Sequence, residues 1–115
     1  MEPKDIVLSF LMAMNQEDFK EARKYVSDDM KFIGVMGTRD SADAYFKDME
    51  HMKLKYDIQK VFQDEETEEV SVFYDITMSG RKIFSSGWYK IKDEKIESFK
   101  VLFDPRPILE AAPKK

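Results

Sequence analysis

The chain has 115 residues, with 19 basic and 23 acidic side chains and a net charge of −4 when its one histidine is neutral. This length fits a single domain, and the mild acidity argues against a nucleic-acid-binding protein, which normally presents a basic face. Since the sequence has no cysteine, disulfides, thiolate metal sites and a cysteine nucleophile are excluded, and a cytoplasmic location is expected.

Two helices are predicted at the start of the chain. Apolar residues from Asp5 to Met14 recur at helical spacing, and Pro3 suits the first turn, where its missing N–H costs nothing. Asn15 is expected to end this helix and to cap the next one. The apolar stripe of the second helix is Phe19, Ala22, Tyr25 and Val26. The longest apolar run, 6–14, is far shorter than the roughly 20 residues that cross a bilayer, so no membrane partner is expected.

A strand and a third helix are predicted next. Residues 30–35 form the expected strand, which ends in a turn at 34–37. Asp40 or Ser41 then caps a helix. Its apolar stripe is Ala42, Tyr45, Phe46, Met49 and Met52.

After Lys53 the apolar period changes from 3.6 to 2, which is typical of β-strands. Tyr56, Ile58 and Phe62 share one expected face of the first of these strands. Three more strands are predicted at 70–78, 82–92 and 96–103, and a short helix at 108–112. The order α-α-β-α-β-β-β-β predicts an α+β fold, with helices packed on one face of an antiparallel sheet.

Three segments carry a resemblance to a known family. They are AMNQEDFKEARKYVSDDMKF, GWYKIKDEKIESFKVLFD and LFDPRPIL. In this order they resemble the nuclear transport factor 2-like superfamily, and specifically its SnoaL-like branch. The resemblance implies one SnoaL-like domain over 1–115. Its fold would be a cystatin-like cone, in which a strongly bent antiparallel sheet wraps around the N-terminal helices and leaves an apolar pocket open at one end.

The resemblance also implies which residues face that pocket. The candidate catalytic residue is Asp75. The candidate ligand-binding residues are Phe10, Phe73, Thr77, Ser85, Tyr89, Phe99, Val101 and Phe103. A ligand-sized cavity, on the order of 300 Å³ or more, is expected among them.

Known active sites of this fold are not intact in the sequence. Matching the ketosteroid isomerase groups onto this chain places Phe10, Gly34 and Gly87 at the three catalytic positions, and none of these side chains exchanges a proton. Of the Asp-Arg-Asp set of limonene epoxide hydrolases, only Asp75 is present. Val101 also replaces the aspartate of SnoaL-type cyclases.

Two functions stay open at this point. In the first, the protein binds a small hydrophobic molecule, and Asp75 performs acid/base chemistry of the isomerase, cyclase or dehydratase type. An acid among Phe73, Phe99 and Phe103 would be desolvated, which favours its neutral form. The alternative places Asp75 in solvent or beside a lysine, in a ligand-binding or dimeric interaction protein that has lost the catalytic groups.

Partners and cofactors follow from the remaining residues. No cofactor is expected, and no metal, because a single histidine, His51, cannot build a multi-histidine site. His51 is expected to be partly exposed at a helix end. Most of the eight methionines are expected to fill the core, with an adaptable pocket wall as the alternative. A homodimer is expected through the outer sheet face, which Tyr74, Ile76 and Trp88 would make apolar.

Overall fold

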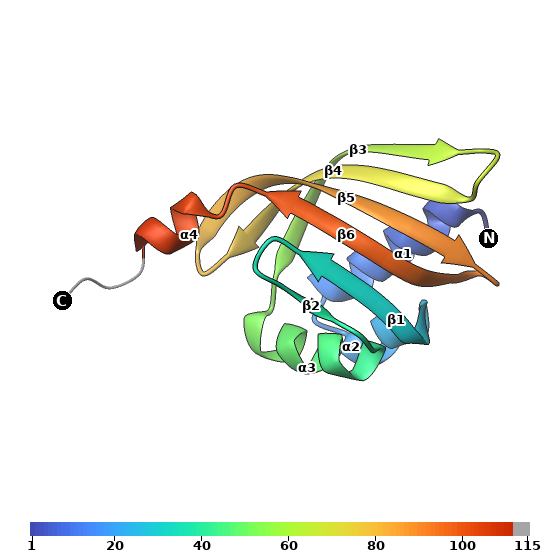
Figure 1. Cartoon of the computed structure of the whole chain (residues 1–115), viewed down its shortest axis with the longest axis horizontal. Helices are drawn as coiled ribbons and strands as arrows, with labels where there is room; N and C mark the ends of the chain where they lie inside the picture. The colour runs from blue at the N-terminus through green and yellow to red at the C-terminus, as the bar shows by residue number, and fades with distance from the viewer. Residues whose placement is uncertain (112–115) are drawn as a thin grey trace.

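The computed structural model describes residues 1–111. Three helices lie below a strongly curved sheet, and a short fourth helix follows its last strand (Figure 1). The elements are α1 (Pro3–Asn15), α2 (Phe19–Arg23), β1 (Val26–Gly34), β2 (Gly37–Arg39), α3 (Ala42–Met52), β3 (Lys55–Asp64), β4 (Glu69–Met78), β5 (Arg81–Lys92), β6 (Lys95–Phe103) and α4 (Arg106–Ala111). This confirms the predicted α+β class.

The sheet is mixed, so the prediction of a purely antiparallel sheet is wrong. Its strand order is β2-β1-β6-β5-β4-β3, and β1 pairs with β6 in parallel. The other neighbours are antiparallel. After α3 the chain enters the sheet as β3, at the edge opposite β2. Three successive hairpins then lead back across the sheet to β6. The last hairpin brings β6 alongside β1 in the same direction.

The helix boundaries differ from the prediction for local reasons. Asp18, not Asn15, caps α2, because its carboxylate accepts the backbone N–H of Glu21 at 3.1 Å. The Asn15 side chain instead pairs with the backbone of Tyr56, donating to its carbonyl at 2.8 Å and accepting its N–H at 2.6 Å. Asn15 therefore fastens α1 to β3.

Two short segments also depart from the prediction. The α2 helix is only five residues long, and Val26, expected within it, begins β1. The predicted turn at 34–37 is followed by β2, which pairs antiparallel with β1. By contrast, Ser41 caps α3 as predicted, its hydroxyl accepting the N–H of Ala44 at 3.2 Å.

The predicted face of β4 is inverted. Val70, Val72, Tyr74, Ile76 and Met78 are buried, and the residues between them are only partly buried. The expected inward set of Phe73, Asp75 and Thr77 therefore lies on the outer face. A one-residue change of register exchanges the two faces of a strand.

A bulge explains a similar correction on β3. The register shifts between Ile58 and Lys60, so Gln59 has no direct partner in β4. Ile58 packs against the core, whereas Phe62 is 51% exposed on the outer face. The extra residue of a bulge breaks the period-2 alternation on which the sequence prediction depends.

The core lies between α1, α3 and the concave face of the sheet. Phe10 is fully buried there and makes edge-on contacts with Phe46 and Phe99. His51 is exposed in the last turn of α3, as predicted. Within residues 1–111, no helix is long and apolar enough to cross a membrane.

Candidate functional site

A cavity of about 230 Å³ opens at the end of the molecule that carries α4. It lies between the β1–β2 hairpin, α3 and the adjoining ends of β3, β4 and β6. Most of its lining is apolar. The lining residues are Phe32, Gly34, Val35, Met36, Gly37, Arg39, Tyr45, Asp48, Met49, Met52, Leu54, Tyr56, Ile76, Met78, Phe99, Val101, Phe103 and Ile108.

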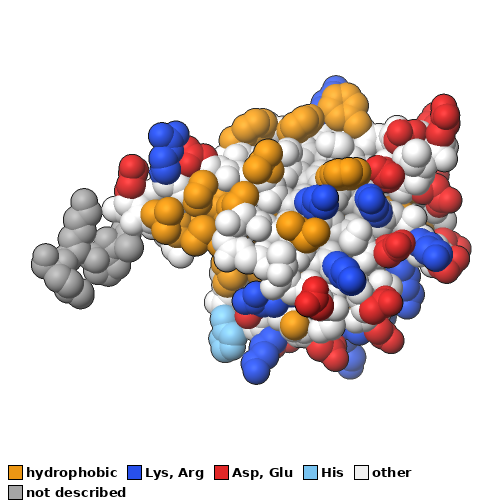
Figure 2. Space-filling view, viewed as in Figure 1, with side chains coloured by type: hydrophobic (Ala, Val, Ile, Leu, Met, Phe, Trp, Pro, Cys, Tyr) orange, Lys and Arg blue, Asp and Glu red, His pale blue; other side chains and the backbone are white. Residues whose placement is uncertain are grey.

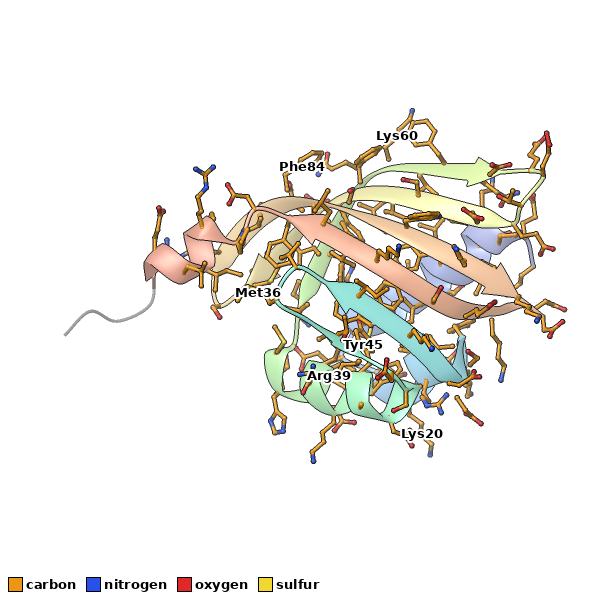
Figure 3. All side chains as sticks on the ribbon, viewed as in Figure 1. Lys20, Met36, Arg39, Tyr45, Lys60 and Phe84 are labelled. Carbon is orange, nitrogen blue, oxygen red and sulfur yellow. The ribbon has the colours of Figure 1, made fainter. Side chains whose placement is uncertain are left out.

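One ion pair contributes to the cavity wall. Arg39 of β2 donates its Nε–H to Asp48 of α3 at 2.5 Å, and an Nη1–H to the carbonyl of Thr38 at 2.7 Å. The two charged side chains are 44% and 37% exposed. Figure 3 places Arg39 and Tyr45 between β2 and α3, with Met36 at the tip of the hairpin. The ion pair therefore belongs to the half-exposed part of the cavity.

Two tyrosines add hydroxyl groups to the lining. Tyr45 of α3 and Tyr56 of β3 are both buried and both line the cavity. Burial raises the pKa of Tyr56 to about 12, although hydrogen bonding with Tyr45 works in the opposite direction. Burial also raises the pKa of Tyr45 well above its ordinary value. Both hydroxyls therefore keep their protons at neutral pH.

Behind the cavity, two further tyrosines close the core. The hydroxyls of Tyr74 and Tyr89 lie 2.8 Å apart and hydrogen-bond to each other. Tyr89 also stacks on Phe99 with ring centroids 4.7 Å apart. Gly87 leaves room for this pair, because a Cβ there would collide with the Tyr74 hydroxyl and the Tyr89 ring. The lack of a side chain at Gly87 therefore lets the two tyrosine side chains lie against the backbone of β5.

The structure divides the predicted ligand-binding residues into three groups. Phe99, Val101 and Phe103 line the cavity. Phe10, Ser85 and Tyr89 face inward but are buried in the solid core, outside the cavity lining. Ser85 donates its hydroxyl to the carbonyl of Ile83 at 3.0 Å, so it is satisfied by its own strand. The third group consists of Phe73 and Thr77, which lie on the outer face of β4 and point away from the cavity.

Asp75 lies on the same face as this third group, so its predicted inward position is wrong. It lies opposite Asp57 in β3 and Phe84 in β5, and it accepts a 3.4 Å hydrogen bond from the side chain of Gln59. Phe73 and Thr77 share its face. Asp75 therefore does not line the cavity.

The sequence contained a signal for the correct face of β4. The residues at 70, 72, 74, 76 and 78 are all apolar or aromatic, whereas the alternate set includes Ser71, Asp75 and Thr77. The uniformly apolar set is the buried one. No pattern in the sequence indicated that Arg39 and Asp48 line the cavity. They come together only because β2 lies beside α3 in the folded chain.

The outer face of the sheet carries an aromatic row. Phe62, Phe73 and Phe84, from three neighbouring strands, lie in contact at 6.1 and 6.2 Å between ring centroids. Trp88 is 43% exposed, and the ammonium groups of Lys90 and Lys100 lie about 5 Å from its ring. Figure 2 shows hydrophobic side chains interspersed with basic ones over this part of the surface. The predicted Tyr74 and Ile76 are buried on the opposite face.

The sequence matches no protein-family model and no curated protein. Among solved structures, the chain is similar to an NTF2-like protein of unknown function from Cytophaga hutchinsonii, with 40% identity over 93% of this chain and 94% of that one, at a TM-score of 0.89.

Two other structures share the fold at lower identity. A proposed SnoaL-like polyketide cyclase from Shewanella denitrificans is 12% identical over 94% of both chains, with a TM-score of 0.80. A de novo designed protein with a curved β-sheet is 17% identical over 95% of this chain and 92% of that one, with a TM-score of 0.76. Because a cyclase-like chain and a designed chain share this architecture, the fold by itself specifies no activity.

Proposed function

The chain belongs to the NTF2-like superfamily, and we propose that its function within this family is to bind a small hydrophobic molecule in the cavity between α3, the β1–β2 hairpin and β6. The observation that carries the proposal is the cavity of about 230 Å³, whose lining is mainly aromatic and aliphatic. A concave, mostly apolar site with few polar groups is the usual form of a small-molecule site. The volume lies below the expected 300 Å³, so it suits a ligand of small size.

Methionines give this cavity an adaptable wall. Met49 and Met78 are buried at its inner side, whereas Met36 and Met52 are 60% and 49% exposed at its mouth. The unbranched, polarisable methionine side chain changes rotamer easily and fills irregular space. Ligand binding can therefore widen the cavity without moving the backbone.

The binding function does not depend on acid/base chemistry at Asp75. That carboxylate lies on the outer face of β4, opposite Asp57. The positions that the resemblance aligns with isomerase groups hold Phe10, Gly34 and Gly87. Of the two functions considered, a ligand-binding protein without the family's known catalytic groups is therefore favoured. Its cytoplasmic location stays a prediction.

A neutral probe tests this function. We expect 1-octanol to bind and to shift the methyl NMR signals of Met49 and Met78. Met52→Trp should weaken binding about tenfold, because an indole at the mouth occupies space that the ligand needs. Met12→Trp is the matched control, since Met12 is also an exposed helical methionine but does not line the cavity. Equal affinities in the two variants, or no binding by the wild type, would contradict the function.

We also propose that the protein forms a homodimer through the outer sheet face. Phe62, Phe84, Trp88 and Leu102 are 51%, 63%, 43% and 67% exposed there. An exposed apolar area of this kind commonly marks an interface. The same face carries both signs of charge. Lys60 lies over Phe62, and Lys90 and Lys100 lie over Trp88. The acidic residues of this face are Asp57, Asp75 and Glu69. A two-fold contact of a face with itself needs both signs, because each group meets a different one on the second copy.

Light scattering tests the dimer. The wild-type protein should give the mass of two chains at micromolar concentration, and Phe84→Lys should reduce it to one. Met12→Lys, which changes a residue of similar exposure on α1, should remain dimeric. A wild-type mass of one chain would refute this proposal while leaving ligand binding untouched.

A further inference from the structure

The polar groups of the cavity are unequal in their hydrogen-bonding capacity. Arg39 and Asp48 are the charged residues among those that line it. A guanidinium has five N–H groups and no acceptor. Arg39 uses one of them on Asp48 and one on the carbonyl of Thr38. In the part of the chain that the structure describes, its Nη2 makes no hydrogen bond, so donors remain available.

The other polar groups of the lining are already partnered, which leaves Arg39 as the main free donor. Asp48 is the carboxylate of the cavity, and Arg39 already occupies one of its oxygens. The hydroxyls of Tyr45 and Tyr56 are protonated and hydrogen-bond to each other, so at most one of their two O–H groups is free to donate. A cavity whose free polar groups are mainly donors is complementary to a ligand that brings acceptors.

The place of Arg39 also suits an ionised ligand group. Its side chain is 44% exposed, so an anion beside it keeps part of its hydration and avoids the full cost of burying a charge. Acidic side chains gather most densely at the opposite end of the molecule, at the β3–β4 and β5–β6 turns, and fewer lie beside α4 (Figure 2), where Asp104 pairs with Arg106 at 2.7 Å. An anion that enters near α4 therefore meets little repulsion from them.

We infer that the ligand of this cavity is an amphipathic molecule with one anionic group, which pairs with Arg39 at the mouth while the apolar body lies against Phe99, Val101 and the methionines. This inference rests on the proposed binding function and adds the ligand's charge and orientation. Asp48 acts as a positioning residue, because its hydrogen bond to Nε holds the guanidinium in place while Nη2 keeps its N–H groups for the ligand.

Three probes with the same apolar chain separate the charge from the binding function. Octanoate, 1-octanol and octylamine differ only in the terminal group. We expect octanoate to bind at least about tenfold more tightly than 1-octanol, and octylamine more weakly than either, by calorimetry at neutral pH. A hydrogen bond to a charged group contributes enough to account for a tenfold difference.

Variants then test the assignment to Arg39. Arg39→Gln should weaken octanoate binding about tenfold and leave 1-octanol within about twofold. Arg23→Gln is the matched control. Arg23 likewise hydrogen-bonds an aspartate, Asp28 at 2.6 Å, and a backbone carbonyl, that of Val26 at 3.3 Å, and it also pairs with Asp43 at 3.6 Å, but it lies outside the cavity. It should change neither affinity.

Asp48→Asn is an independent test, because it should change octanoate affinity in the direction opposite to Arg39→Gln. The amide oxygen still accepts the Arg39 Nε–H, but the negative charge that repels an anion is gone. Octanoate should therefore bind more tightly than it does to the wild type, and a loss of octanoate binding would contradict the inference.

The possible failures are distinguishable. If 1-octanol and octanoate bind equally, or if Arg39→Gln weakens both alike, the anionic pairing is wrong and the binding function stands. If none of the three probes binds to the wild type, the proposed function itself fails, and this inference fails with it.

Discussion

Removing both hydroxyls of the buried tyrosine pair should cost less stability than the sum of the two single removals. Tyr74 and Tyr89 are about 0% and 1% exposed, and their hydroxyls bond to each other at 2.8 Å. Tyr74→Phe leaves the Tyr89 hydroxyl buried without its partner, and Tyr89→Phe does the reverse. An unsatisfied buried hydroxyl costs about 1–3 kcal/mol, so each single variant should lose about 2 kcal/mol of unfolding free energy.

The double variant removes both hydroxyls and leaves no orphan. Its loss should be about 1 kcal/mol, the net value of one hydrogen bond. The two single losses would add to about 4 kcal/mol, so the coupling energy should be about 3 kcal/mol and at least 1 kcal/mol. This non-additivity is the expected signature of two groups that satisfy each other.

Urea denaturation measures these differences. With a slope of about 2 kcal/mol per M, each single variant should lower the midpoint by about 1 M. Tyr25→Phe is the control, because the Tyr25 hydroxyl bonds Glu21 at a partly buried site that water can reach. It should cost less than about 1 kcal/mol. If the double variant loses the sum of the singles, the two hydroxyls do not depend on each other and the reasoning is wrong.

Three further outcomes are expected. Between pH 10 and 12 the unfolding free energy should fall by about 2–3 kcal/mol on account of Tyr56, because its pKa is about 12 in the fold against 10 for an ordinary tyrosine. The contribution is complete below pH 10 and is lost as the pH rises through 12; Tyr56→Phe should make the fall smaller by this amount, while the remaining fall comes from Tyr45, Tyr74 and Tyr89, whose pKa values burial also raises, and an unchanged profile would refute it. Asn15→Ala should lose about 2 kcal/mol in urea denaturation, because both backbone groups of Tyr56 lose their partner; a loss below about 0.5 kcal/mol would show that water replaces the side chain. Asp75→Asn should leave 1-octanol affinity within about twofold by calorimetry, as its outer-face position requires, whereas a tenfold change would return Asp75 to the site.

Local patterns in the sequence determined the helices and most strands. The apolar spacing of α1 and α3 and the Ser41 cap predict these helices correctly, because helix formation depends on neighbours within four residues. The alternation on β5 and β6 likewise predicts that Ser85, Tyr89, Phe99 and Val101 face inward. These predictions need only the period of one element.

Which side chains of β3 face the core could be predicted only with information from its partner strand. The bulge at Gln59 turns Phe62 outward, and the pairing with β5 places Asp75 opposite Phe84. Whether a bulge forms depends on how two strands fit together, so alternation along one strand does not reveal it. On β4, by contrast, the uniformly apolar set at 70, 72, 74, 76 and 78 does indicate the buried face.

The resemblance predicted an apolar pocket that includes Phe99, Val101 and Phe103, but the other walls of the cavity were decided by tertiary structure. Its mouth joins Arg39 of β2 to Asp48 of α3 at 2.5 Å, and its wall joins Tyr56 of β3 to Phe103 of β6. The sequence indicated which faces of α3 and β6 are apolar. It did not determine that they surround one space, because the parallel pairing of β1 with β6 and the curvature of the sheet, both long-range features, bring the ends of these elements together.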